Sequence, residues 1–311
     1  MGYLAFLFPG QASQYVGMGK DLYDHSPLAR KLFDMADQEM GTGLSQLCFG
    51  GPEEALRQTA ITQPAVFVHS VAALLLLRER GLRPDYVAGH SLGEYSALVA
   101  AEALDFESGL RLVKRRGDLM QEAGDRQPGA MAAIMGLDDD TVVDLCARCN
   151  GTVVAANFNA PGQLVISGEV PAVEEVSAAA GEAGAKKVVP LPVSAAFHSP
   201  LMEPAAIELQ ELLAQAPLSK AKIPVVTNVG ASPVQEVDEL RAQLSAQMTS
   251  PVRWTESMGC MTKLGVDSAI EVGPGSVLKG LHRRIDRTLQ IANAATLEGI
   301  EQAAESVAEP G

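Results

Sequence analysis

Short apolar runs alternate with longer amphipathic stretches along most of the chain. Strands separated by helices in this way are typical of a parallel sheet that is covered by helices on both faces. The apolar runs predict strands at Leu4–Phe8, Tyr86–Ala88, Met131–Met135, Val153–Asn157, Gln163–Ser167, Lys187–Pro190, Val225–Thr227 and Ser268–Glu271. The amphipathic stretches predict helices at Pro27–Glu39, Pro64–Arg80, Glu94–Ala103, Phe106–Glu122, Asp139–Cys149, Val170–Ala183, Ser199–Ala214 and Asp238–Met248.

One block departs from this alternation. Between about residues 129 and 193 the predicted order is strand, helix, strand, strand, helix, strand, and the turn Asn159–Gly162 joins the middle strands as a hairpin. This is the order of a ferredoxin-like unit. We therefore predict an α/β-hydrolase-like parallel-sheet large subdomain, residues 1–127 and 194–311, with an inserted ferredoxin-like small subdomain, residues 128–193. The tail Gln302–Gly311 has no strong pattern and is expected to fray.

Composition and charge fit a soluble enzyme. The 311 residues are 47% hydrophobic and 20% charged, which is ordinary for a globular protein. The net charge of −14 argues against nucleic acid and anionic membrane surfaces as general partners. The longest apolar stretch, Pro64–Leu77, is interrupted by His69 and Ser70 and predicts a core helix rather than a membrane span. No basic residue precedes the apolar run Leu4–Phe8, so it does not resemble a signal peptide.

The four cysteines give little support for a metal site. Cys146 and Cys149 form a C-x-x-C pair, but no second Cys or His pair lies near them in the sequence. We therefore expect reduced structural thiols, no bound metal and a cytoplasmic protein.

The segment Gly89-His-Ser-Leu-Gly93 carries the strongest chemical signal. It follows a predicted strand and precedes a predicted helix, which is the setting of a G-x-S-x-G nucleophile elbow. Such a turn places Ser91 at its tip, next to a helix N-terminus that favours developing negative charge. The alternative is a plain strand-to-helix turn without chemistry.

A nucleophilic serine needs a base, and the chain has five histidines. His198 lies in a loop between a predicted strand and a long helix, where catalytic groups are common. His282 lies in a helix beside Arg283 and Arg284 and is expected to be exposed. Position favours His198 over His282 and leaves both open. The other three are expected to be a surface residue, a hydrogen-bonded core residue and a residue pointing away from the serine hydroxyl, namely His25, His69 and His90.

Five groups of motifs extend the signal around Ser91 to most of the chain. They are Phe8-Pro-Gly-Gln-Ala-Ser-Gln14 with Gly17-Met-Gly19, Gly89–Tyr95, Lys114-Arg-Arg-Gly117 with Met120-Gln-Glu122, Phe158-Asn-Ala-Pro-Gly-Gln163 with Val165-Ile-Ser-Gly168, and Ala196-Phe-His-Ser199. Together they resemble the malonyl-CoA:acyl-carrier-protein transacylases of fatty acid synthesis. The trans-acting and modular acyltransferases of polyketide synthesis share these motifs. The resemblance covers about Leu4 to Leu289 and keeps the family's order.

The resemblance implies a catalytic serine and histidine without a carboxylate as the third catalytic group. Ser91 matches the family's nucleophile and His198 its base, while the backbone carbonyl of Gln247 would hold the histidine tautomer. Gln11 matches the oxyanion-hole residue, with the Leu92 N–H as the second donor. Outside the resemblance, Gln247 is an ordinary residue at a helix end and Gln11 belongs to a turn after the first strand.

The resemblance also implies how the substrate is held. Arg116 matches the arginine that binds the malonyl carboxylate, because a planar guanidinium can make two parallel hydrogen bonds to it. Neighbouring helix positions face different sides, so one of Arg115 and Arg116 can face the core while the other faces water. Phe197 would crowd a C2 methyl and favours malonyl over methylmalonyl units. Met120 and His90 complete the implied substrate site.

The implied reaction is a ping-pong transfer of malonyl from malonyl-CoA to the phosphopantetheine thiol of an acyl carrier protein. It needs no metal or redox cofactor, because malonyl-CoA is itself the substrate. Carrier proteins are acidic, so a chain of net charge −14 needs a local basic patch to bind one. Pairs of solvated charges are the alternative explanation for the basic residues that match the family at these places, namely Lys186, Lys187, Arg283 and Arg284.

Three function classes remain open at this stage. The first is the transacylase, either of fatty acid synthesis or a trans-acting polyketide enzyme. The second is a G-x-S-x-G serine hydrolase or thioesterase, for which His282 could serve but no acidic partner stands out. The third is a non-catalytic module that binds carrier proteins, against which the joint presence of Ser91, His198, Gln11 and Arg116 argues.

Overall fold

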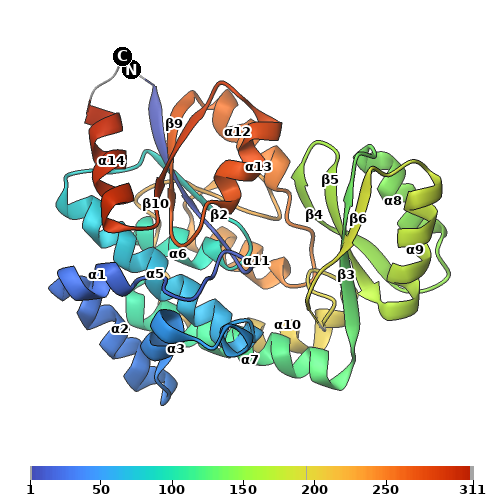
Figure 1. Cartoon of the computed structure of the whole chain (residues 1–311), viewed down its shortest axis with the longest axis horizontal. Helices are drawn as coiled ribbons and strands as arrows, with labels where there is room; N and C mark the ends of the chain where they lie inside the picture. Colours follow the sequence, from blue (N-terminus) through green and yellow to red (C-terminus); the bar gives the residue numbers. More distant parts are fainter. Residues whose placement is uncertain (1, 194, 309–311) are drawn as a thin grey trace.

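The computed structural model describes residues 2–193 and 195–308, which form a large and a small subdomain side by side (Figure 1). The large subdomain is built on one six-stranded sheet. Its first five strands are parallel, and only the last is antiparallel to its neighbour. The strands lie in the order β10 (Gln290–Ala294), β9 (Val266–Val272), β1 (Tyr3–Phe8), β2 (Tyr86–Gly89), β7 (Val225–Val226) and β8 (Pro233–Val234).

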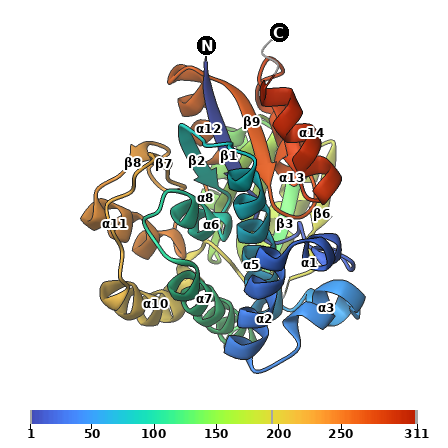
Figure 2. The same cartoon turned by 90° about the vertical axis from the view of Figure 1, so that its left-hand side faces the viewer.

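The central strand β1 explains why helices cover both faces of this sheet. Its side chains alternate in direction, so Phe6 and Phe8 enter one apolar core and Ala5 and Leu7 enter another. The core on the first face is closed by the helices α2 (Pro27–Met40), α5 (Thr59–Glu79), α6 (Gly93–Ala100) and α7 (Phe106–Arg126) (Figure 2). The core on the second face is closed by α12 (Trp254–Lys263) and α13 (Val277–Ile285).

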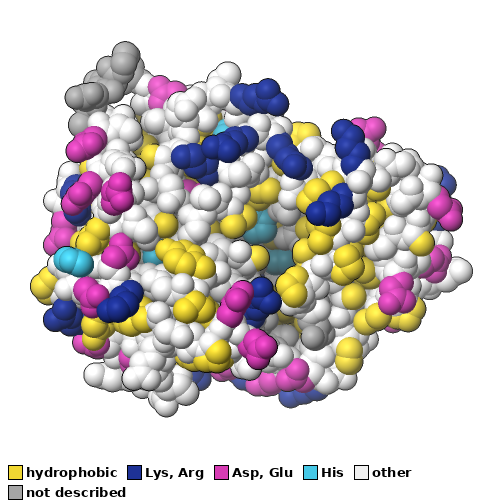
Figure 3. Space-filling view, in the orientation of Figure 1, with side chains coloured by type: hydrophobic (Ala, Val, Ile, Leu, Met, Phe, Trp, Pro, Cys, Tyr) yellow, Lys and Arg dark blue, Asp and Glu magenta, His cyan; other side chains and the backbone are white. Residues whose placement is uncertain are grey.

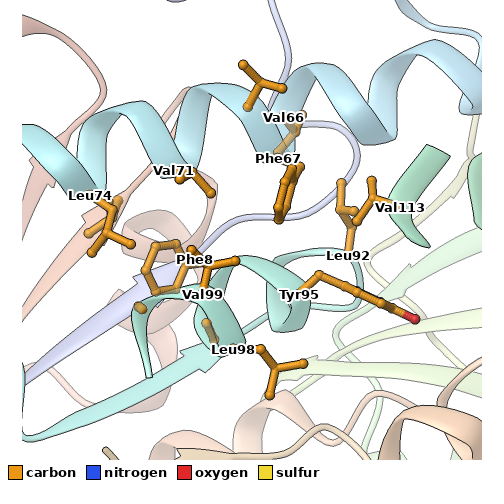
Figure 4. Close-up of a cluster of buried hydrophobic side chains, with 14 of the residues drawn as sticks. Phe8, Val66, Phe67, Val71, Leu74, Leu92, Tyr95, Leu98, Val99 and Val113 are labelled. Atoms are coloured by element: carbon orange, nitrogen blue, oxygen red, sulfur yellow. The ribbon is translucent and has the colours of Figure 1, made fainter. Parts of the chain in front are cut away.

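The helix that follows the G-x-S-x-G segment is held firmly in the first core. Residues of α6 pack between β1 and α5, where Leu92 and Tyr95 lie among Phe8, Phe67 and Val113 (Figure 4). Fixing α6 in this way fixes the turn that precedes it. The remaining helices of the large subdomain are α1 (Lys20–His25), α3 (Leu44–Gly50), α4 (Glu53–Leu56), η1 (Pro200–Met202, a 3₁₀ helix), α10 (Glu203–Gln215), α11 (Val237–Gln247) and α14 (Leu297–Ala308).

The small subdomain is a four-stranded antiparallel sheet with helices on one face. Its strands lie in the order β4 (Val153–Ala160), β5 (Gln163–Glu169), β3 (Gly129–Met135) and β6 (Lys187–Pro190), and its helices are α8 (Asp139–Arg148) and α9 (Val170–Glu182). Ala132 and Ile134 of β3 pack on these helices. Met131 and Ala133 point to the opposite face, toward the large subdomain. The predicted fold class is confirmed, whereas the boundaries of the inserted unit stay a prediction.

The hairpin between β4 and β5 is tighter than the predicted turn Asn159–Gly162. The strands run to Ala160 and from Gln163, so only Pro161 and Gly162 form the turn. Gly162 has φ +68°, a conformation that glycine adopts without steric strain.

Helix α5 begins at Thr59, so the prediction of a start at Pro64 was wrong. A proline favours the first turn of a helix, but here Pro64 lies inside the helix because surrounding packing outweighs the lost hydrogen bond. This helix is long and apolar enough to cross a membrane, yet 83% of its most apolar 18-residue stretch is buried inside the fold. The burial agrees with the predicted core helix.

The C-terminal segment also differs from expectation. Residues 302–308 belong to α14, whose Ile300 and Ala303 are buried in the first core, so this part does not fray. Residues 309–311 of the predicted tail lie outside the described residues. The edge strand β10 and helix α12 were missed, because short or glycine-containing elements give weak periodic patterns.

Candidate active site

The two glycines of the elbow are required by close backbone contacts. A Cβ on Gly93 would lie 2.1 Å from the carbonyl oxygen of Phe8, and a Cβ on Gly89 would lie 1.9 Å from the carbonyl carbon of Gly93. Both distances are far shorter than any tolerable contact. Ser91 lies between them with φ +51°, an uncommon backbone conformation for a residue with a side chain. The tight approach of β1, β2 and α6 therefore presents Ser91 at the tip of the turn.

Two backbone N–H groups near Ser91 are free to bind an oxyanion. Within the described residues, neither the Leu92 N–H nor the Gln11 N–H has a hydrogen-bond acceptor. The side chain of Gln11 is engaged elsewhere, since its Nε2 donates to Thr59 Oγ1 at 3.2 Å. Gln11 can thus contribute its backbone N–H, whereas its side-chain amide is held by the start of α5.

His198 is in position to deprotonate Ser91. Its Nε2 lies 2.8 Å from Ser91 Oγ, and its Nδ1 lies 2.9 Å from the backbone oxygen of Gln247 at the end of α11. A carbonyl can only accept, so Nδ1 carries the proton and Nε2 is left to accept the serine hydroxyl. No carboxylate is needed to select this tautomer.

Burial keeps His198 neutral. Its side chain is 4% exposed. Desolvation, together with the nearby positive charge of Arg116, lowers the pKa of His198 to about 3. The imidazole is therefore a free base at neutral pH, although a weaker one than an exposed histidine.

Arg116 of α7 reaches the same point from the other side. It is 1% exposed and donates from Nη1 to Gln63 Oε1 at 2.6 Å, and from Nη2 to Gln247 Oε1 and Ser91 Oγ at 3.0 Å each. Among the described residues, no carboxylate forms a salt bridge with it. Its neighbour Arg115 faces outward and pairs with two surface glutamates, as the helical period predicted.

These groups open into a cavity of about 560 Å³ between the two subdomains. Figure 3 shows this hollow, with histidine atoms in its depth and basic side chains around its upper side. Its walls come from the free face of the small sheet, from α13 and from the loop before His198. Predicted site residues among its lining are Gln11, His90, Ser91, Leu92, Arg116, Met120, Lys187, Phe197 and His198.

The structure places the other predicted residues less uniformly. His90 Nε2 lies 2.8 Å from Asn159 Oδ1, so its ring points toward the small subdomain and away from the serine hydroxyl, as expected. Met120 and Phe197 are buried beside the cavity. The four residues predicted for carrier binding are all exposed, and Arg284 bonds to Gln163 at the cavity wall.

Two predictions about histidines were wrong. His282 is 2% exposed rather than on the surface, because its side of α13 faces the sheet while Arg283 and Arg284 face solvent. His282 is also absent from the lining of the Ser91 cavity. His69 is fully buried, but neither ring nitrogen has a hydrogen-bond partner among the described residues.

Sequence reasoning missed three polar residues that touch the machinery: Gln63, Glu94 and Asn228. Gln63 accepts a hydrogen bond from Arg116, and Asn228 Oδ1 accepts from the Ser91 backbone N–H at 2.6 Å. Glu94 accepts from Gln247 Nε2 at 2.9 Å. Gln63 and Glu94 each interrupt an apolar helical stretch, which is the signal that could have found them. Asn228 follows a short strand and carries no such signal.

Comparison with known proteins agrees with this geometry. A family model described as an acyl transferase domain matches residues 5–303. The malonyl CoA-acyl carrier protein transacylase of Bacillus subtilis is 46% identical over 99% of this chain and 98% of its own length. The Escherichia coli K12 protein of the same name is 46% identical over 93% and 94%.

The chain belongs to the malonyl-CoA:acyl-carrier-protein transacylase family. Two solved structures of this family have nearly the same fold. The Coxiella burnetii transacylase has a TM-score of 0.96 at 38% identity, covering 99% of this chain and 98% of that one. A malonyl-transacylase solved with a type II polyketide synthase acyl-carrier protein has a TM-score of 0.95 at 42% identity, covering 98% and 99%. The acyltransferase prediction is supported, and the serine hydrolase alternative is not.

The described residues offer no cluster of side chains that could bind a metal ion. Within residues 2–193 and 195–308, no three His, Cys, Asp or Glu side chains cluster as metal ligands. That the reaction needs no cofactor stays a prediction.

The low pKa of His198 predicts how acylation depends on pH. Because the ring is neutral in the free enzyme, kcat/KM for acylation of Ser91 by malonyl-CoA should stay flat from about pH 8 to about pH 5. The measurement is single-turnover acylation across this range. Burial also raises the pKa of Glu94 to about 7, so Glu94→Gln serves as a control that cannot titrate there. An inflection near pH 6.5 in both proteins would contradict a neutral, buried His198.

Proposed function

We propose that this chain transfers malonyl groups from malonyl-CoA to an acyl carrier protein through an ester on Ser91. The observation that carries the proposal is the meeting of a serine–histidine pair and a buried arginine in one cavity. His198 accepts the Ser91 proton as Oγ attacks the thioester carbonyl. The Gln11 and Leu92 N–H groups stabilise the oxyanion, and the CoA thiolate leaves with the proton from His198. The carrier's phosphopantetheine thiol then attacks the ester in the same way.

Arg116 gives the site its preference for a diacid. One of its N–H groups donates to Ser91 Oγ, and among its three acceptors only Ser91 lines the cavity. An incoming carboxylate therefore takes the place of Ser91 Oγ on the guanidinium and releases the nucleophile. It also neutralises the positive charge that lowers the His198 pKa, which strengthens the base. An acetyl group does neither.

The size of the acyl group is limited by Phe197 and Met120. Both side chains are buried and line the cavity in which Ser91 and Arg116 lie. A methyl branch at C2 would have to displace one of them, so malonyl fits better than methylmalonyl. Steric selection of this kind is modest, on the order of 10- to 200-fold per methylene-sized group.

The enzyme works in the cytoplasm in this proposal, with reduced thiols and no cofactor. The relatives suggest a soluble protein, and they include one solved with a polyketide carrier. Fatty acid and polyketide carriers present the same phosphopantetheine thiol, so the same chemistry serves both.

Trapping the intermediate tests the nucleophile. Incubation with malonyl-CoA should add one malonyl mass to the peptide that carries Ser91, and Ser91→Ala should abolish both the adduct and transfer, as mass spectrometry of the digested protein would show. Ser96→Ala is the matched control, because Ser96 is buried on α6, the helix that follows the elbow, and its hydroxyl has no hydrogen-bond partner among the described residues. An adduct on Ser13, Ser96 or Ser199, or rapid net hydrolysis without an ester, would refute the assignment.

Removing the guanidinium tests the selectivity. Arg116→Ala should lower the ratio of kcat/KM for malonyl-CoA to that for acetyl-CoA by at least about 30-fold, since losing one partner of a buried charge pair typically costs 2–5 kcal/mol. Acetyl transfer should be unchanged or faster, because Ser91 Oγ no longer accepts a hydrogen bond from Arg116. Arg116→Lys should restore only part of the ratio, as lysine lacks the two-pronged geometry. Arg115→Ala is the control, and an unchanged ratio in Arg116→Ala would remove Arg116 from the site.

The exposed basic residues beside the cavity are proposed to bind the carrier protein. Lys187 lines the cavity itself, and Arg284 is tied to Gln163 on its wall. Lys186 and Arg283 extend this basic rim. Attraction between the rim and an acidic carrier would direct the phosphopantetheine arm toward Ser91 despite the net charge of −14.

Reversing one charge on the rim tests this surface. Arg284→Glu should raise the KM for the carrier protein by at least about fivefold and make it less sensitive to salt, while acylation by malonyl-CoA stays unchanged. Arg148→Glu is the matched control, because it makes the same charge change on the exposed side of α8. Equal KM values for the two variants would place the carrier elsewhere.

A further inference from the structure

The buried carboxylate of Glu94 lies close to the nucleophile in the sequence and has no part in the chemical steps described above. Glu94 is 1% exposed and sits in the first turn of α6, three residues after Ser91. Within the described part of the chain it forms no salt bridge. Burial raises the pKa of Glu94 more than the positive charge of Arg116 lowers it, so hydrogen bonds to neutral groups must compensate much of the cost of burial.

Glu94 accepts two hydrogen bonds on one oxygen. Its Oε2 lies 2.9 Å from Gln247 Nε2 and 3.1 Å from the backbone nitrogen of Asn228. These partners come from the loop after β7 and from the last residue of α11, which are separate in the sequence. The carboxylate therefore ties both segments to the helix that follows the elbow.

Asn228 passes this restraint on to the turn itself. Its Oδ1 accepts from the Ser91 N–H at 2.6 Å, and its Nδ2 donates to the Gly89 carbonyl at 2.6 Å. One side chain thus bridges the two sides of the turn. A shift of Asn228 would move the backbone that carries Ser91 Oγ.

Gln247 passes the restraint on to the base and to the arginine. Its Nε2 donates to the Ser91 carbonyl at 3.0 Å as well as to Glu94, and its Oε1 accepts from Arg116. Its backbone oxygen accepts from His198 Nδ1. The position of this one residue therefore decides where the nucleophile, the base and the guanidinium stand relative to one another.

We propose that Glu94 is a positioning residue for the transfer reaction. It acts through Gln247 and Asn228 to keep His198 Nε2 within hydrogen-bond distance of Ser91 Oγ. The role belongs to its acceptor oxygen rather than to its charge. A protonated carboxyl or an amide also offers one oxygen that accepts both N–H groups. The inference rests on the proposed function only for its kinetic readout.

Kinetics separate this role from a general effect on folding. Glu94→Ala should lower kcat for acylation with both malonyl-CoA and acetyl-CoA by about 10- to 100-fold, with little change in KM, because small displacements of reacting groups cost this much. Glu94→Gln should keep kcat within about threefold of the wild type, since the two hydrogen bonds survive. Equal losses for both substrates distinguish it from Arg116→Ala.

The chain offers a matched control in Glu271. It is fully buried at the end of β9 and accepts the backbone N–H groups of Leu278 and Lys279 at 2.9 Å each, so it caps α13 rather than the elbow. Burial raises its pKa to about 7, as it does for Glu94. Glu271→Ala should lower the melting temperature and leave kcat within about threefold of the wild type.

Proton NMR gives a readout that does not depend on turnover. The buried Nδ1–H of His198, bonded to the Gln247 carbonyl, should give a downfield resonance that is assigned by its loss in His198→Ala. The resonance should persist in Glu94→Gln and Glu271→Ala and should broaden or vanish in Glu94→Ala. If Glu94→Ala fails to fold, Gln247→Met removes the Gln247–Glu94 bond, together with the side-chain bonds to Arg116 and the Ser91 carbonyl, and keeps the backbone carbonyl. The resonance should broaden or vanish in this variant too.

The outcomes are decisive in both directions. A folded Glu94→Ala that keeps its resonance and its kcat overturns the proposal, and so does a Glu94→Gln variant as defective as Glu94→Ala. A wild-type protein that never forms the malonyl ester would refute the proposed function instead. The behaviour of the resonance would still test how Glu94 holds His198.

Discussion

Burying the guanidinium of Arg116 is the constraint on which the rest of the site depends. A cation that is 1% exposed and forms no salt bridge among the described residues depends on the attraction of the Glu94 carboxylate, which opposes the lowering of the Arg116 pKa by burial, and on hydrogen bonds to neutral oxygens. Gln63, Gln247 and Ser91 supply them. The compensation is incomplete, because Arg116 Nε has no acceptor in the described part of the chain. In the proposed function, a substrate carboxylate would accept from the N–H group that Ser91 Oγ accepts from here, which suits the site to a diacid.

The same constraint explains why distant segments meet at this point. The nucleophile follows β2, the arginine lies on α7, Gln247 ends α11, and the base lies on the strand-to-helix connection that leaves the small subdomain. Each segment is fixed by packing before it presents its polar group. Because Gln247 contacts the other three, the acceptor that orients His198 and the acceptor that holds Arg116 move together. Through Gln247, the orientation of His198 is linked to the position of the Arg116 guanidinium, with no carboxylate hydrogen-bonded to the histidine.

The sequence predicted the alternating architecture, the inserted subdomain and the elbow, because these follow from local periodicity and glycine spacing. Position favoured His198 over His282 but could not decide between them without the family motifs, because contact with Ser91 Oγ is visible only in the folded structure. The hydrogen bonds of Gln63, Glu94 and Asn228 could not be predicted, because their partners lie far away in the chain. Helix α14 and strand β10 were missed because docking on the sheet, rather than their own pattern, defines them.

A crystal structure of the enzyme with malonyl esterified to Ser91 tests the central claim most directly. The account predicts that the malonyl carboxylate lies within hydrogen-bond distance of the Arg116 guanidinium, where it replaces Ser91 Oγ as the acceptor of the Nη2 hydrogen bond. The bonds from Arg116 to Gln63 and Gln247, and from His198 to the Gln247 carbonyl, should remain. A carboxylate bound elsewhere in the cavity, with the guanidinium still directed at the serine oxygen, would contradict the account.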